Sequence, residues 1–192
     1  MDVKKYKKIG VLIVILVFAV IWIASSYNGL VRKDERCNSQ WSKVQTQYQR
    51  RLDLIPNLVS TVKGYAKHES ETLERVIAAR NKALNTPSNE SSSVAYEKAQ
   101  NTVTSAIRDI NVVVERYPEL KANENFLALQ SQLESTENRI AVERQRYADT
   151  IRIYNQSVRK FPTSIIADIF SFGQKEYYQA DASAASSPKV EF

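Results

Sequence analysis

The sequence has few of the residues that most enzyme and metal sites need. Its 192 residues include one cysteine, one histidine and one methionine. This excludes an internal disulfide framework and every metal site or catalytic dyad that needs two such side chains. Only four glycines and five prolines are present, whereas the two together average about 12% of a protein. So few turn residues indicate long helices and argue against all-β and doubly wound folds.

The positive charge is concentrated at the N-terminus. The net charge is +6, and Lys4, Lys5, Lys7 and Lys8 all lie in a basic arm of residues 1–8. The other charges are spread along the chain without a cluster of stacking aromatics, so nucleic acid is not an expected partner. A basic arm before an apolar run favours contact with a membrane.

An apolar run follows the basic arm. Every residue from Ile9 to Ala24 is apolar or glycine, and with its flanks the run is long enough to cross a bilayer as a helix. We therefore predict a transmembrane helix over residues 9–26. Lysines and aromatic residues, which favour the headgroup level of a bilayer, lie at both ends of this helix. They are Lys7, Lys8, Trp22 and Tyr27.

A cleaved signal peptide is the alternative for this segment. Ala24, Ser25 and Ser26 have the small side chains of a cleavage site, but the apolar run is long and bulky for a signal peptide, which favours an uncleaved anchor. Four lysines precede the run and three basic residues follow it closely. This excess favours a cytoplasmic N-terminus and an exported body.

The body, residues 27–178, has the apolar spacing of long amphipathic helices. Apolar residues recur in steps of three and four over residues 41–77, 95–117 and 126–161, which predicts three long helices. A loop rich in serine and asparagine separates the first two at residues 85–93. The fold class is therefore all-α: a transmembrane helix followed by an elongated antiparallel bundle of three long helices and one short one.

The fourth, short segment follows Pro162 and is unusually apolar. It contains Ile166, Phe170 and Phe172, and such a strip must bury its face against something. It is a short helix that completes the bundle, a helix at the membrane interface, or a surface for a partner. The tail, residues 179–192, is small and polar, and we predict that it is disordered.

Pro56 falls inside the first long helix. A proline removes one helical hydrogen bond, so we expect a kink or a local opening between Asp53 and Asn57. The polar residues Arg51, Asp53 and Asn57 either restore a partner to the freed backbone carbonyl or form a notch that receives a partner protein.

Glu143 lies within the apolar stripe of the third long helix. A buried carboxylate must be paired or neutral. We therefore predict an ion pair between helices that joins Glu143 to Arg51 or Arg80.

His68 and Glu69 resemble the start of a zinc-protease motif, but the chain has no second histidine to complete it. We expect His68 to lie on a helix face near Tyr65 and Glu69, and a titratable group beside a helix kink is also a candidate pH sensor.

Three blocks of the sequence resemble the LemA family of bacterial membrane proteins. They contain Asp53-Leu54-Ile55-Pro56-Asn57-Leu58-Val59 in the first block, Tyr117-Pro118-Glu119-Leu120-Lys121-Ala122 in the second, and Tyr154-Asn155-Gln156-Ser157-Val158 in the third. The resemblance implies a single-pass anchor in the bacterial cytoplasmic membrane and a helical bundle, and it implies no activity. The usual description of the family places the short N-terminus outside, opposite to the orientation that the lysines favour.

The sequence therefore predicts contact with partners, without catalysis. We expect a scaffold or adaptor without a catalytic residue, metal or cofactor, bound to the bilayer and to a membrane or envelope protein. The alternatives are a self-assembling homo-oligomer, a membrane-remodelling protein and, least favoured, an enzyme. The candidate partner-binding residues are Arg51, Asp53, Pro56, Asn57, Tyr65, His68, Glu69, Ile166, Phe170 and Phe172.

Overall fold

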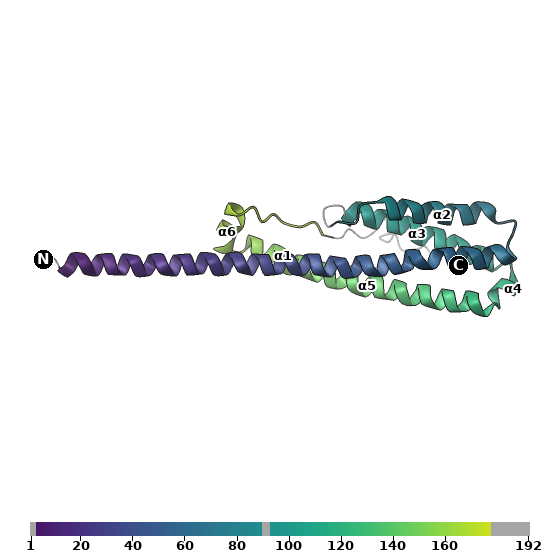
Figure 1. Ribbon diagram of the computed structural model, residues 1–192, viewed down its shortest axis with the longest axis horizontal. Coiled ribbons are helices and arrows are strands. Elements are labelled where there is room, and N and C mark those ends of the chain that lie inside the picture. Colours follow the sequence, from purple (N-terminus) through teal and green to yellow (C-terminus); the bar gives the residue numbers. More distant parts are fainter. Residues whose placement is uncertain (1–2, 90–92, 178–192) are drawn as a thin grey trace, which may run out of the picture. The chain divides into compact units, whose positions relative to one another are not determined.

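The computed structural model describes residues 3–89 and 93–177, and these contain helices and no strand (Figure 1). The predicted all-α class is confirmed. The helices are α1 Val3–Tyr65, α2 Ser70–Asn85, α3 Ser93–Val114, α4 Pro118–Lys121, α5 Glu124–Arg159 and α6 Thr163–Ile169. The predicted disordered tail, residues 179–192, lies outside the described residues.

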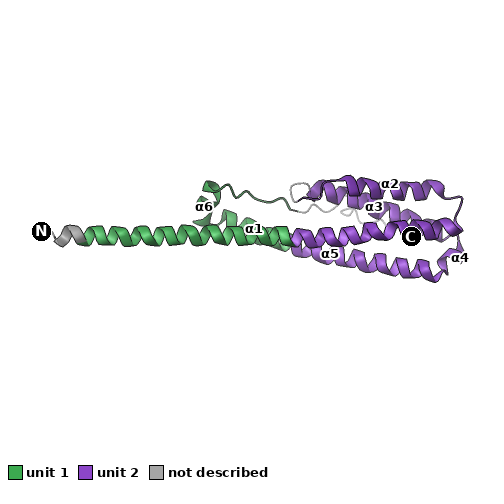
Figure 2. Cartoon of the chain, in the orientation of Figure 1, with its two compact units in different colours: residues 1–39, 148–177 green, residues 40–147, 178–192 purple. Residues whose placement is uncertain are grey.

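The chain forms two compact units (Figure 2). Among the described residues, unit 1 comprises 3–39 and 148–177, and unit 2 comprises 40–89 and 93–147. Both α1 and α5 contribute to each unit.

Unit 1 contains the apolar run as the first part of α1. An 18-residue window there has a mean hydropathy of 2.8 and is not buried at all, so this helix is long and apolar enough to cross a membrane. Large apolar side chains are exposed along it from Ile9 to Ile23. The rest of unit 1 has buried side chains on three helices, including Leu30 on α1, Ile151 on α5 and Ile166 on α6.

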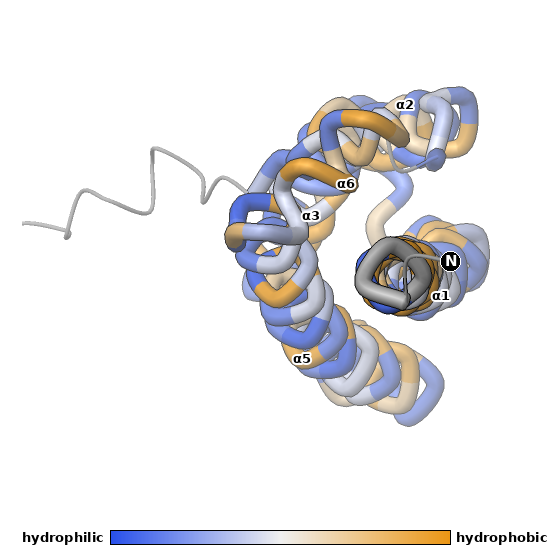
Figure 3. Tube along the Cα trace, turned by 90° about the vertical axis from the view of Figure 1, so that its left-hand side faces the viewer, coloured by the Kyte–Doolittle hydropathy of each residue, from blue (hydrophilic) through white to orange (hydrophobic). Residues whose placement is uncertain are grey.

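Unit 2 is an antiparallel bundle whose successive long helices alternate in direction (Figure 1). Viewed along the chain axis, α2, α3 and α5 form an arc beside α1 (Figure 3). Each contributes its apolar stripe to one core, with Ile55 on α1, Val76 on α2, Ile110 on α3 and Phe126 on α5 among the buried residues. Full burial of such a side chain stabilises the fold by about 1.5–3 kcal/mol.

The structure corrects the count of long helices. The stretch predicted as one helix over residues 41–77 is two helices, because α1 ends at Tyr65 and α2 begins at Ser70. Between them Ala66 is buried, and the Glu69 N–H donates to the Ala66 carbonyl at 3.1 Å in a tight reversal. Because Ala66 remains in the core, buried residues keep a helical spacing through this turn. The apolar pattern of the sequence therefore does not show that the chain reverses here.

The later helices agree with the sequence pattern to within a few residues. α3 ends at Val114, three residues before the predicted end, and the short helix α4 then starts at Pro118. Proline suits the first turn of a helix, because the N–H groups of that turn have no partner within the helix and the missing N–H of proline therefore breaks no hydrogen bond. α5 covers the predicted third long helix, and α6 is the predicted short one.

Pro56 lies inside α1, and the helix continues through residues 53–57, so the predicted local opening is wrong, while the predicted kink stays a prediction. The carbonyl of Leu52 would accept from residue 56 in a regular helix, and proline has no N–H to donate. Arg80 of α2 supplies the donor instead, with Nε at 2.9 Å from the Leu52 oxygen. The residue that repairs the backbone therefore comes from the neighbouring helix and not from Arg51, Asp53 or Asn57.

Candidate interaction site

A buried arginine joins three helices in the interior of unit 2. Arg51 of α1 is 2% exposed. Its Nη1 donates to Thr104 Oγ1 and to Glu137 Oε2, each at 2.8 Å. Its Nη2 donates to the carbonyl and to Oε1 of Gln100, at 2.9 and 2.6 Å. The guanidinium also lies 5.3 Å from the centre of the Tyr48 ring. Both terminal nitrogens are thus fully used within the bundle.

The position of Arg51 follows from the apolar stripe of α1. It directly precedes Leu52 and lies one turn before Ile55, and both are fully buried. A charge on this face must be paired, because an isolated buried charge costs several kcal/mol. Glu137 supplies the negative charge from α5 and keeps half of its own side chain in solvent, at 49% exposed.

The predicted pair between Arg51 and Glu143 is wrong. Glu143 pairs with Arg146 on its own helix at 2.7 Å, and it accepts from Gln40 Nε2 at 2.5 Å. It is only partly buried, so it needs no buried counter-charge. Arg80, the predicted alternative partner, is engaged with the Leu52 carbonyl.

A second polar pair links α3 and α5. Glu97 is buried and lies 3.8 Å from Arg144 Nε. Burial raises the pKa of Glu97 from 4.5 to about 7, although the positive charge of Arg144 acts in the opposite direction. Glu97 therefore changes its charge near neutral pH while it is folded.

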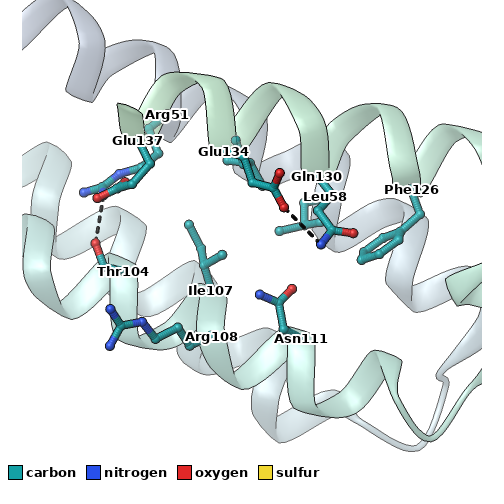
Figure 4. Close-up of a pocket in the computed structure, with 11 residues that line it drawn as sticks. Arg51, Leu58, Thr104, Ile107, Arg108, Asn111, Phe126, Gln130, Glu134 and Glu137 are labelled. Carbon is teal, nitrogen blue, oxygen red and sulfur yellow. Dashed lines mark hydrogen bonds and ion pairs between the residues drawn. The ribbon is translucent and has the colours of Figure 1, made fainter. Parts of the chain in front are cut away.

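A cavity of about 210 Å³ opens between α1, α3 and α5, next to Arg51 (Figure 4). Its floor is apolar and consists of Leu58, Ile107, Phe126 and Leu133. Its rim carries side chains of both charges and two amides: Arg108, Asn111, Gln130 and Glu134. The pair of Arg51 and Glu137 closes one end.

The size of this cavity limits what it can hold. Pockets for drug-sized ligands and cofactors measure about 300–1,000 Å³, so 210 Å³ is smaller than that range and suits one or two apolar side chains. Apolar pockets with a polar rim are the usual receptors for the anchoring side chains of a partner protein. The described residues contain no group of three histidine, cysteine or acidic side chains that could hold a metal.

The predicted residues Tyr65 and Glu69 lie at the reversal between α1 and α2. The Tyr65 hydroxyl accepts from Asn123 Nδ2 at 2.9 Å. Glu69 pairs with Arg116 at 3.0 Å and accepts from the Tyr117 hydroxyl at 3.3 Å. These contacts join the two connections at this end of unit 2. His68 is exposed in the turn between α1 and α2, so the predicted position on a helix face is wrong, because the chain reverses here.

The other predicted residues of unit 2 are on the outside of α1. Asp53, Pro56 and Asn57 are exposed. Asp53 accepts from Gln49 at 2.7 Å on its own helix, and Asn57 lines a shallow groove between α1 and α5. Of the predicted partner-binding residues, only Arg51 reaches the cavity.

The remaining predicted residues belong to unit 1. Ile166 is buried, Phe170 is 47% exposed, and Phe172 is partly buried. The Tyr27 ring lies 4.8 Å from that of Phe170 and 5.6 Å from that of Phe172, between ring centres. The other predicted anchor residues, Lys7, Lys8 and Trp22, are exposed on α1.

Sequence reasoning misses most of the cavity. Leu58, Phe126 and Leu133 belong to the predicted apolar stripes, whereas Asn111 and Gln130 are ordinary polar residues on helix surfaces. The one available signal is Arg51, a charge within an apolar stripe.

Comparison with known proteins identifies the family. The sequence model of the LemA family matches residues 40–192. The chain belongs to the LemA family. This confirms the resemblance seen in the sequence. The match begins at residue 40, where unit 2 begins, and covers the whole bundle together with the part of unit 1 on α5 and α6.

Several curated proteins are similar to the chain along most of its length. Protein LemA of Metamycoplasma hominis is 24% identical over 153 residues, which cover 80% of this chain and 68% of that protein. Magnetosome protein MamQ 2 of Paramagnetospirillum magneticum is 24% identical over 194 residues, covering 88% and 71%. Magnetosome protein MamQ of Magnetospirillum gryphiswaldense is 22% identical, covering 85% and 68%.

Proposed function

We propose that this LemA-family protein is a membrane-anchored adaptor without enzymatic activity, which binds a membrane or envelope protein through the cavity between α1, α3 and α5. The single observation that carries the proposal is the cavity itself. Its apolar floor and charged rim suit an apolar side chain from a partner segment, and its 210 Å³ is too small for most cofactors.

The use of the charged groups supports a role without catalysis. Arg51, the most deeply buried charge of unit 2, uses both terminal nitrogens for contacts within the bundle. A catalytic acid or base must instead reach a proton on the substrate. Glu97, with its raised pKa, lies against Arg144 and does not line the cavity.

The architecture supports a role at the membrane. The apolar run and the first helix of unit 2 are parts of the same unbroken helix, α1. We propose that this helix anchors the protein in the bacterial cytoplasmic membrane, with the N-terminus inside the cell and the bundle outside. Three of the relatives are named magnetosome proteins, and that name identifies no partner for this chain.

Site-specific photo-cross-linking in intact membranes tests the proposal. A photoreactive residue replaces Asn111 on the rim, and a matched probe replaces Lys98, which is exposed on the same helix away from the cavity. We expect an adduct with one distinct protein at Asn111 and not at Lys98. Gln130→Trp should fill the mouth of the cavity and abolish the adduct, whereas Asn138→Trp on the same helix should not.

The outcomes separate the adaptor from its alternatives. An adduct with a second copy of this chain would favour the self-assembling scaffold, and an adduct with lipid alone would favour a membrane-remodelling protein. The orientation has its own test. A cysteine at exposed His68, in a chain with Cys37→Ala, should react with a membrane-impermeant maleimide in intact cells; protection until lysis would reverse the orientation.

A further inference from the structure

Large apolar side chains are exposed on and around α6 in unit 1. Ile166 and Ala167 of α6 are buried, yet the exposed side of the helix is also largely apolar, with Asp168 as its one exposed charge. Figure 3 shows an orange stretch at α6. The α6 surface, as we name it, consists of Ile165, Ile169 and Phe170, which are 49%, 66% and 47% exposed. A surface helix in water would carry polar residues on this side.

Aromatic contacts fix this surface beside the end of the apolar run. The Phe170 and Phe172 rings pack on Tyr27 of α1, at 4.8 and 5.6 Å between ring centres. Tyr27 follows Ala24, the last residue of the run, by three positions, or about 5 Å along the helix. The Phe170 ring therefore lies within roughly 10 Å of the point where the apolar run ends.

The turn after α6 holds both rings in place. The Phe172 N–H donates to the Ala167 carbonyl at 2.8 Å, and the Ser171 N–H donates to the Asp168 carbonyl at 3.3 Å. This is the left-handed helix cap that usually uses glycine, and Ser171 adopts it with φ of 59°. That conformation costs a residue with a Cβ about 1–2 kcal/mol, so the surrounding contacts determine it.

The chain after this turn is tied to α1 and α5. Asn155 of α5 binds both backbone groups of Lys175: Nδ2 donates to the carbonyl, and Oδ1 accepts from the N–H, each at 2.9 Å. The Lys175 ammonium lies 2.9 Å from Asp34 of α1. The α6 surface is thus held at a defined height on α1.

We propose that the α6 surface lies in the headgroup region of the bilayer and forms a second membrane contact beside the transmembrane helix. The inference rests on the proposed anchoring of α1. If the apolar run spans the hydrocarbon core, a group within roughly 10 Å of its end lies at the headgroup level. Interfacial helices insert their apolar faces about 5–10 Å at this boundary, and aromatic rings gather there.

The α6 surface adjoins the proposed transmembrane helix, and this favours lipid over a protein as its cover. The contact between Tyr27 and Phe170 joins the exposed surface directly to the helix that enters the membrane. Phe161, in the turn between α5 and α6, is also strongly exposed and apolar. Lipid covers such side chains at this height without any further protein.

Spin labels on the full chain in phospholipid bilayer discs test this inference. Single cysteines replace Ile169 on the α6 surface, Val112 on α3 as a matched control, and Phe18 within the apolar run. Ile169 and Val112 are both 66% exposed. Each variant is made with Cys37 kept, because its thiol is buried, and again with Cys37→Ala. The readout is the collision rate with lipid-soluble oxygen relative to that with a water-soluble nickel chelate.

We expect a ratio several-fold higher at Ile169 than at Val112, and highest at Phe18. A low ratio at Ile169 together with a high one at Phe18 would overturn the second contact while the anchor stands. An immobile Ile169 label shielded from both reagents would also overturn it, because a protein or a second copy would then cover the surface. A low ratio at Phe18 would refute the anchor and this inference together.

Discussion

The two units differ in the side chains that depart from the usual burial pattern: unit 2 buries a charge, and unit 1 exposes apolar side chains on α6. Unit 2 places a charge in its interior and pairs it there: the two terminal nitrogens of Arg51 bind Glu137 and Gln100, although its Nε has no partner among the described residues. Unit 1 places large apolar side chains on its exterior, as α6 shows with Ile169 and Phe170. Unit 2 also exposes single large apolar side chains, such as Val112 at 66%, whereas three such side chains lie close together in sequence on and next to α6 in unit 1. We propose that this difference separates a part that contacts a protein from a part that contacts lipid.

The largest expected effect tests the internal network of unit 2. Arg51→Met removes four hydrogen bonds and leaves Gln100 without its donor, so the free energy of unfolding should fall by about 3 kcal/mol. Chemical denaturation of the full chain in detergent measures it. The matched control Glu137→Gln should cost about 1 kcal/mol or less, because Glu137 is half exposed. Equal losses for the two variants would contradict a network centred on Arg51.

The next expected effect is a pH dependence of the stability of unit 2, which Glu97 causes. The folded protein keeps the Glu97 proton up to about pH 7, because burial raises its pKa, whereas the unfolded chain releases it near 4.5. Between these values the folded state binds more protons, so rising pH lowers the stability, by about 3 kcal/mol in total. Glu97→Gln should lack this loss. Denaturation of both proteins from about pH 4.5 to 8 measures the difference, and parallel curves would refute the raised pKa.

Asn155 tests whether unit 1 is fixed locally. Asn155→Ala removes both hydrogen bonds to the Lys175 backbone, so the Lys175 amide should exchange its hydrogen about tenfold faster. Amides of α2 and α3 should be unchanged. Ser157→Ala on the same helix is the control. Faster exchange throughout unit 2 would show that Asn155 supports the whole fold and not the end of unit 1 alone.

The smallest expected effect concerns the repaired carbonyl in α1. Arg80→Met leaves the Leu52 oxygen without its donor and should cost about 1 kcal/mol. In a chain with Pro56→Ala, the new backbone N–H at position 56 can donate to the same oxygen, so Arg80→Met should then cost clearly less. A double-mutant cycle measured by denaturation gives the coupling energy between Arg80 and Pro56. A coupling energy of zero would show that Arg80 does not replace the backbone donor that Pro56 lacks.

The sequence predicts the helices well and their connections less well. Apolar spacing and Pro162 locate both ends of α5 to within two residues of the predicted 126–161, whereas α3 ends at Val114, three residues before the end that Pro118 predicts. The reversal after Tyr65 escapes this reasoning because Ala66 keeps the buried spacing through the turn. Periodicity reports which residues are buried, and it contains no information on whether the chain continues or turns back.

The candidate site is only partly predictable for a related reason. Arg51 stands out as a charge close to an apolar stripe. The prediction places its partner inside the facing stripe, at Glu143, but a long arginine reaches Glu137 at the solvent edge of α5. Likewise, the cavity depends on how three helices pack, which the sequence of each helix does not record.

One paired measurement tests the central claim, that unit 2 contacts a protein while unit 1 contacts lipid. Photoreactive residues are placed at Asn111 and at Ile169 in separate full-length chains, the same intact membranes are irradiated, and the adducts are identified by mass spectrometry. We predict one distinct protein at Asn111 and phospholipid at Ile169. A protein adduct at Ile169, or only lipid at Asn111, would contradict the account.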